Sequence, residues 1–249
     1  MKKDVICGIH AVLTALQRNP KHIDTVWLNE DRLDKRSEEI VRTARAAHVK
    51  LWRVPHTKLD KLAGTERHQG VVGRYRARRS ADERGLQALL AELTETPLLL
   101  ILDGVQDPHN LGACLRSADG LGAHAVIMPR DRAVSVTATV RRTASGAAES
   151  VPVFEVTNLS RALHQLKNAG IWLLGASQEA ETVIFEADLD RPLGLVLGGE
   201  EKGLRRLTRE HCDALVRIPM LGTVSSLNVS VAAAVCLYEA LRQRQVRDS

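Results

Sequence analysis

The feature that most constrains the fold is a series of six short apolar segments, separated by helix-like stretches, between residues 97 and 219. The first, PLLLILDGV (97–105), is apolar at consecutive positions, as expected of a parallel strand covered on both faces. Repeated alternation of strands and helices predicts an α/β fold with a largely parallel sheet. The other candidate strands are residues 123–129, 151–156, 171–177, 193–199 and 214–219, with helical stretches at 110–122 and 158–170.

The first 76 residues carry a separate and shorter α/β pattern. Ser37 is the expected N-cap of a helix in this part, and Gly64 is expected to end another. Helices are expected at residues 8–18, 37–48 and 57–64, and strands at 25–28, 49–54 and 69–76.

Residues 77–85 are polar and charged, which is typical of a linker, and a short helix is expected at 86–93. We therefore expect an N-terminal domain at 1–76, a linker at 77–96 and a second domain at 97–249.

The charge of the chain is distributed unevenly. The net charge is +5, yet residues 1–80 hold 18 basic and 9 acidic residues, a net of +9, while residues 81–249 hold 17 and 21, a net of −4. A basic part beside a mildly acidic one favours a polyanion-binding domain joined to a domain with another task. A basic surface that binds no ligand explains the charge equally well.

Two classes of protein are disfavoured by composition. No charged residue lies between Arg217 and Glu239, but the uninterrupted apolar stretch is only Val231 to Leu237, and a membrane span needs about 20 residues. The four cysteines are scattered without paired spacing, which favours reduced thiols in the cytoplasm over a disulfide framework or a zinc site. We expect no N-terminal signal, no membrane span and no metal.

Polar residues gather where three of the predicted strands end, which is where α/β sheets bind ligands. After the first strand, Asn110 is a possible N-cap, and Arg116 lies six positions later, so the two side chains need not share a helix face. A capped helix with one exposed arginine is the simpler interpretation. A functional site is favoured by the concentration of Asp, Asn, His and Arg at one strand end.

The second strand end reads LVLGGEEKG, where Gly198 and Gly199 allow close backbone approach to a ligand. It contains neither a dinucleotide-binding fingerprint nor a P-loop. At the third, residues 218–241, Ser225 or Ser226 is the expected N-cap of a helix rich in small residues. Asn228 and Ser230 stand in the first turns, where polar side chains need partners.

Together, and in this order, the three segments resemble the signature motifs of the SpoU branch of the SPOUT RNA methyltransferases. The likeness extends to GIHAV (8–12) and HQGVV (68–72), which resemble the substrate-binding domain of the bacterial enzymes that methylate a guanosine of 23S ribosomal RNA. The matching motif residues are Asn110, Gly112 and Arg116, then Gly198, Glu200 and Gly203, then 218–220 and 226–230.

The resemblance implies a SPOUT domain with a parallel sheet and a deep trefoil knot at 97–249, preceded by a small α/β RNA-binding domain that resembles ribosomal protein L30e. It implies transfer of a methyl group from S-adenosylmethionine to the ribose 2'-hydroxyl of a guanosine in 23S ribosomal RNA. It further implies a cytoplasmic homodimer that associates through the SPOUT domain, binds no DNA and completes each site with residues from both protomers.

Carried over to this chain, the family's functional residues form two sets. The catalytic set is Asn110, Arg116, Glu200, Ser226 and Asn228, and the S-adenosylmethionine-binding set is Gly198, Ile218 and Leu227. Because a guanidinium is effectively always protonated, we expect Arg116 to hold a phosphate and polarise the hydroxyl rather than to act as a simple base.

Two other functions fit the same residues. One is a ribosome-associated binding protein that keeps the fold without methylating, although such a protein has no physical reason to keep Asn110, Arg116, Glu200 and Asn228 together. The other is methylation of a transfer RNA ribose, against which the N-terminal GIHAV and HQG segments weigh.

Overall fold

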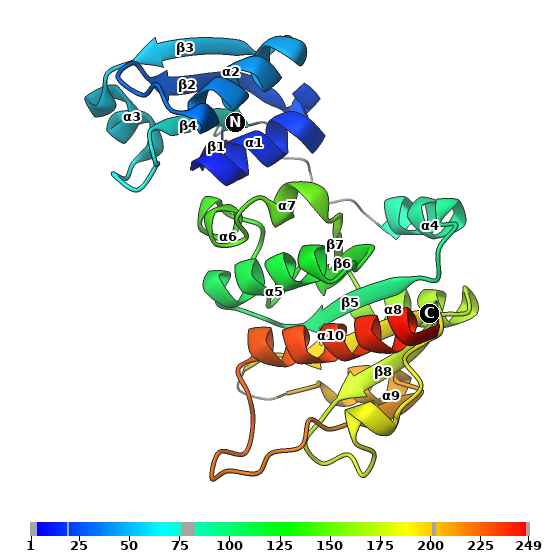
Figure 1. Cartoon of the computed structure of the whole chain (residues 1–249). Helices are drawn as coiled ribbons and strands as arrows, with labels where there is room; N and C mark the ends of the chain where they lie inside the picture. The colour runs from blue at the N-terminus through cyan, green and yellow to red at the C-terminus, as the bar shows by residue number, and fades with distance from the viewer. Residues whose placement is uncertain (1–3, 19, 76–82, 201–202, 248–249) are drawn as a thin grey trace. The chain divides into compact units, whose positions relative to one another are not determined.

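The computed structural model describes residues 4–18, 20–75, 83–200 and 203–247. These residues form two compact units, Met1–Arg79 with Val136–Ser150, and Ser80–Ser135 with Val151–Ser249. Each unit contains its own sheet (Figure 1). The boundaries expected from the sequence, 1–76, 77–96 and 97–249, remain a prediction.

The first unit is built on a four-stranded sheet in the order β1-β4-β2-β3. The pair β2–β3 is parallel, and β4 runs antiparallel to both β1 and β2. The strands are β1 (Asp4–Cys7), β2 (Ile23–Asn29), β3 (Lys50–Val54) and β4 (Val71–Tyr75), and the helices are α1 (Ile9–Arg18), η1 (Pro20–His22), α2 (Lys35–Ala46) and α3 (His56–Ala63).

The main core of this unit lies between the sheet and helices α1 and α2, where Val12, Leu28 and Ile40 are fully buried. A smaller cluster that includes Trp27 and Leu59 packs α3 against the sheet. The expected helices and strands are therefore present. Helix α3 ends as predicted at Gly64, which has a left-handed φ of 66°.

Helix α2 begins earlier than the sequence suggested, and the prediction that Ser37 caps it is wrong. The N-cap is Asp34, whose carboxylate accepts a hydrogen bond from the Ser37 backbone N–H at 2.8 Å. Ser37 is buried within the first turn, and its hydroxyl donates to the Asp34 carbonyl at 2.7 Å. An ionised carboxylate caps a helix at least as well as a hydroxyl does.

Two short helices from the middle of the chain, α6 (Ala138–Thr143) and α7 (Ala147–Ser150), complete the first unit by packing on β1 and α1. They are joined by a buried ion pair between Arg141 and Glu149. The Arg141 guanidinium also lies 4.9 Å over the ring of Tyr75. A buried charge is tolerated only when it is paired, so this segment is held by specific contacts.

The second unit contains a six-stranded sheet in the order β10-β8-β9-β5-β6-β7, and all of its strand pairs are parallel. The predicted parallel α/β fold is thus confirmed, although β10 is shorter than the expected 214–219. The strands are β5 (Leu98–Asp103), β6 (Ala125–Pro129), β7 (Val153–Val156), β8 (Trp172–Ala176), β9 (Leu193–Gly198) and β10 (Ala214–Val216).

Helices cover both faces of this sheet, which explains why β5 is buried at every position (Figure 1). Leu86, in the segment expected to be a linker, packs in one core with residues of α8 and the sheet. On the other face α10 packs along α5 and β9. The remaining helices are α4 (Glu83–Glu92), α5 (Pro108–Gly120), α8 (Leu159–Asn168), η2 (Ile184–Glu186), α9 (Arg206–His211) and α10 (Val229–Arg247).

Two further helix caps differ from the prediction. Helix α5 is capped by Asp107, which accepts from the His109 N–H at 2.8 Å, and Pro108 fits the first helical position, so Asn110 is not the cap. Helix α10 begins after Asn228, whose side-chain oxygen accepts from the Ser230 N–H at 2.9 Å, so neither Ser225 nor Ser226 caps it. In the described part of the chain, no helix combines the length and apolar character needed to cross a membrane.

Both ring nitrogens of His68 have partners within the first unit. It is fully buried, its Nδ1 accepts from the Gly70 backbone N–H at 3.1 Å, and its Nε2 lies 2.8 Å from Asp60 Oδ1. Because Nδ1 accepts a hydrogen bond, Nε2 carries the ring proton and donates a hydrogen bond to Asp60. This bond holds the pKa of Asp60 below its ordinary value. With both nitrogens engaged, His68 has no lone pair left for a metal ion, although His56 also approaches Asp60.

We predict that His68→Ala lowers the free energy of unfolding by about 2 kcal/mol, because the buried Gly70 N–H and Asp60 lose their partner. The matched control is His56→Ala, since His56 contacts the same carboxylate at 3.3 Å but is 54% exposed. Urea titration followed by tryptophan fluorescence measures both variants. Equal losses for the two variants would contradict the structural role of His68.

Candidate functional site

The candidate site lies at the carboxyl edge of the parallel sheet, where the segments that follow β5 and β9 meet. Asp103 and Gly198 are register partners at the ends of these strands. Gly199 then donates its backbone N–H to the Asp103 carbonyl at 3.1 Å, which extends the pairing by one residue. The first two motif segments are therefore neighbours because the strands that precede them are neighbours.

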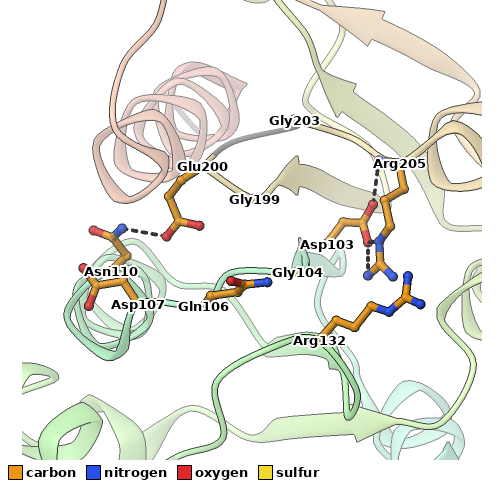
Figure 2. Close-up of a pocket in the computed structure, with 10 residues that line it drawn as sticks. All are labelled: Asp103, Gly104, Gln106, Asp107, Asn110, Arg132, Gly199, Glu200, Gly203 and Arg205. Carbon is orange, nitrogen blue, oxygen red and sulfur yellow. Dashed lines mark hydrogen bonds and ion pairs between the residues drawn. The ribbon is translucent and has the colours of Figure 1, made fainter.

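The side chain of Asn110 joins all three motif segments. Its amide nitrogen donates to Glu200 Oε1 at 2.7 Å, and its oxygen accepts from Asn228 Nδ2 at 3.1 Å. Figure 2 shows the bond between Asn110 and Glu200 across the pocket. Asn228 in turn accepts from the Ser230 hydroxyl at 2.7 Å. An amide suits this position because it donates and accepts at once.

Five of the predicted residues line one cavity of about 360 Å³, which we call the Gly198 cavity. They are Gly198, Glu200, Ile218, Ser226 and Leu227. All three residues assigned to cofactor binding thus lie together, beside two residues of the catalytic set. The cavity has both a polar rim and apolar walls, and the loop after β8 contributes Ser177, Gln178 and Glu179.

Glycine is required at the floor of this cavity. A Cβ atom at Gly198 would overlap the backbone of Gly203 and Leu204. Gly203 has a left-handed φ of 60° and donates its N–H to the Gly199 carbonyl at 3.1 Å. The glycines of the second motif therefore allow two backbone segments to touch, and a larger residue at 198 would force them apart.

A second cavity of about 450 Å³, the Asn110 cavity, adjoins the first. Gly199, Glu200 and Gly203 line both cavities. Figure 2 shows its other side chains converging from the segments after β5, β6 and β9. They are Asp103, Gln106, Asp107, Asn110, Arg132 and Arg205, together with Gly104.

An ion pair between a buried carboxylate and a partly exposed arginine at the Asn110 cavity was not anticipated from the sequence. Asp103 is only 2% exposed, and its carboxylate accepts from Arg205 Nε at 2.6 Å and from the Arg205 backbone N–H at 2.9 Å. The pair ties the end of β5 to the residue before α9. The position of Asp103 at the end of an apolar strand could have indicated a buried acid. Nothing in the sequence indicated that Arg205 is its partner.

Two residues of the catalytic set do not line either cavity. Asn228 reaches the site through its bond to Asn110. Arg116 is exposed on α5, and its side chain forms no hydrogen bond or ion pair with any of the described residues. The structure of a single chain therefore unites Asn110, Glu200, Ser226 and Asn228 but leaves Arg116 apart.

The nearby thiol of Cys114 is not a nucleophile. Burial raises its pKa to about 12, and the negative charge of Glu200 adds to the shift. A thiolate is the reactive form, so covalent catalysis by this cysteine is disfavoured at neutral pH. The polar groups of the two cavities are instead amides, hydroxyls, carboxylates and guanidinium groups, which orient a substrate rather than attack it.

Comparison with models of known families shows which family this chain belongs to. The model of the "SpoU rRNA Methylase family" matches residues 97–238, and that of "RNA 2'-O ribose methyltransferase substrate binding" matches residues 5–81. The chain belongs to the SpoU rRNA methylase family. The resemblance inferred from the three motifs is thereby confirmed.

Relatives within this family are similar over nearly their whole length. The 23S rRNA (guanosine-2'-O-)-methyltransferase RlmB of Ralstonia nicotianae is 50% identical, covering 98% of both chains. RlmB of Shewanella oneidensis is 49% identical, covering 98% of this chain and 99% of its own. The SpoU methyltransferase AviRb from Streptomyces viridochromogenes, solved in complex with AdoMet, is 27% identical with a TM-score of 0.81, covering 98% of this chain and 91% of its own.

Proposed function

We propose that this SpoU-family enzyme transfers a methyl group from S-adenosylmethionine to the ribose 2'-hydroxyl of a guanosine in 23S ribosomal RNA. The observation that carries the proposal is the Asn110 bridge, which holds the three motifs between two adjoining cavities. The full-length similarity to RlmB enzymes supports the choice of substrate.

The Gly198 cavity suits the cofactor. S-adenosylmethionine, when bound, supplies an electrophilic methyl group and leaves as a neutral thioether, so no metal is needed. Gly198 gives access to backbone groups, while Ile218 and Leu227 offer apolar contacts for an adenine ring. Ser226 and Glu200 at the same cavity supply polar partners.

The Asn110 cavity suits the ribose that accepts the methyl group. Asn110 and Glu200 are held in fixed orientations by their mutual bond, and Asn228 fixes the Asn110 amide from the other side. Preorganised hydrogen-bonding groups of this kind can position a hydroxyl without reorganising during the reaction. Because Glu200 borders both cavities, the ribose and the methyl donor would meet beside it.

Arg116 is proposed to act in the site of a partner subunit. Val231, Val235 and Tyr238 form an apolar stripe on α10 at helical spacing, and they are 47%, 36% and 62% exposed. An exposed apolar stripe of this kind is a candidate interface. Because α10 packs on α5, a homodimer formed through this stripe would carry Arg116 toward the partner's cavities. Arg116 would then polarise the hydroxyl and hold the adjacent phosphate.

Finer features of the fold also belong to this proposal. We infer a trefoil knot from the family resemblance, at the place where the residues after β9 and those before α10 line the same cavity. The basic charge of residues 1–80 supports RNA capture by an N-terminal domain of the L30e-like type. We assign residues 1–76 to RNA binding, 77–96 to a linker and 97–249 to catalysis, in a cytoplasmic enzyme that does not act on DNA.

Methylation of transfer RNA is the less favoured alternative. The SpoU tRNA modifying enzyme of A. aeolicus covers only 67% of this chain, with a TM-score of 0.57. The RlmB enzymes cover 98% of it, including the N-terminal residues. A catalytically inactive binding protein is disfavoured because the Asn110 bridge is intact.

We predict that two single substitutions impair different steps, one the methyl transfer and the other the binding of the cofactor. Arg116→Ala should reduce methyl transfer by at least about a hundredfold while leaving S-adenosylmethionine affinity unchanged, because Arg116 lines neither cavity. Gly198→Ala should abolish cofactor binding, because its Cβ overlaps the backbone of Gly203.

Isothermal titration with S-adenosylmethionine and transfer of labelled methyl groups to 23S ribosomal RNA measure the two properties separately. Wild-type turnover by Arg116→Ala would remove Arg116 from the mechanism. Absence of methyl transfer by the wild-type protein under these conditions would contradict the proposed function itself.

We predict that Val235→Asp converts the dimer to monomers, because a charge would then have to be buried in the apolar stripe. Leu33→Asp is the control, since Leu33 is 78% exposed in the first unit. Sedimentation velocity of both variants tests the interface. A dimer that survives the change at Val235 would place the interface elsewhere.

A further inference from the structure

A third cavity, of about 590 Å³, lies at the ends of β6 and β7 and has no role in the function proposed above. Arg132 and Arg205 line both this cavity and the Asn110 cavity, so the two hollows adjoin. We call it the Arg132 cavity. Its other polar and charged lining residues include Asp131, Thr157, Ser160, Arg206 and Thr208.

The charge of the Arg132 cavity differs in sign from that of its neighbour. Arg132, Arg205 and Arg206 face a single acid, Asp131. The Asn110 cavity instead combines two arginines with Asp103, Asp107 and Glu200. The hydroxyls of Thr157, Ser160 and Thr208 add neutral donors to the Arg132 cavity. Arginines combined with hydroxyl donors are typical of a phosphate-binding site.

The three arginines are not equally available. Arg205 is paired with the buried Asp103, and Arg206 pairs with Glu210 at 2.6 Å on the surface. Arg132 has no hydrogen bond or ion pair of its side chain to any residue that the structure describes. Figure 2 shows its side chain extended toward the guanidinium of Arg205 rather than toward a carboxylate.

The backbone of Arg132 is also held in a costly conformation. Its φ of 58° lies in the left-handed region, which arginine seldom adopts. The loop is fixed beside the end of β5, where the Val134 N–H donates to the Val105 carbonyl at 3.0 Å. Such strain persists only where the surrounding structure enforces it, and it is concentrated at functional sites.

We propose that the Arg132 cavity binds a phosphodiester group of the RNA strand that carries the target ribose, with Arg132 as its principal contact. This inference rests on the proposed function. A ribose in the Asn110 cavity is covalently followed by phosphates, and the adjoining hollow with excess positive charge is where the strand can continue. The role of Arg132 is to position the substrate rather than to react with it.

The test measures RNA affinity and catalysis for Arg132→Asn, since asparagine tolerates a left-handed backbone while removing the charge. The affinity for a 23S ribosomal RNA fragment should fall roughly tenfold, and the slope of log affinity against log salt should fall by about 0.7–0.9. The turnover number at saturating RNA and the affinity for S-adenosylmethionine should stay unchanged. Arg132→Lys should restore most of the salt slope.

The matched control is Arg130→Asn. Arg130 is an exposed arginine directly after β6 and two residues before Arg132, but it lines neither the Arg132 cavity nor the Asn110 cavity. Asp131→Asn makes the net charge of the Arg132 cavity more positive, whereas Arg132→Asn makes it less positive, because Asp131 is the one acid that lines the cavity. RNA affinity should increase severalfold in that variant.

Equal losses of RNA affinity in Arg130→Asn and Arg132→Asn would overturn the proposal, because they would indicate a general effect of charge. A lower turnover number with unchanged RNA affinity would also overturn it. Both results presuppose a wild-type enzyme that methylates the RNA, so they are distinct from a failure of the proposed function.

Discussion

The hydrogen bonds of the Asn110 side chain are the interaction on which the rest of the site depends. One amide donates to Glu200, 90 positions away in the chain, and accepts from Asn228, 118 positions away. An aspartate could not donate and would repel Glu200, whereas a leucine could do neither. The bridge is possible because Asp107 caps α5 in place of Asn110 and leaves its side chain available.

In this arrangement the backbone brings the motif segments together and shapes the cavities, while the side chains supply the polar contacts. Parallel pairing of β5 with β9 brings two motif segments together, and the glycines at 198 and 203 let the backbone close around one cavity. The buried charge of Asp103 at the end of β5 is paired with Arg205. Two cavities that share Glu200 follow, one suited to a methyl donor and one to a ribose.

The sequence predicted the parallel sheet and every described strand except β1 (Asp4–Cys7), because consecutive apolar residues and period-2 patterns depend only on local chain geometry. Five residues named from the family motifs lie on the Gly198 cavity, while the roles assigned to them remain a prediction. The helix caps expected at Ser37, at Asn110 and at Ser225 or Ser226 were wrong, because several polar residues compete for a cap and small differences in geometry decide which one forms it. The Asp103–Arg205 pair and the place of Arg132 depend on contacts between distant segments, which no periodicity reveals.

We propose that the cavities of one subunit are completed by Arg116 of its partner. Mixing Arg116→Ala protein with Gly198→Ala protein under conditions of subunit exchange tests it directly. If the site is shared, each mixed dimer regains one complete site, and an equal mixture should recover about a quarter of wild-type methyl transfer. If Arg116 serves its own subunit, each site in the mixed dimer keeps one defect, and a mixture no more active than its parents would contradict the account.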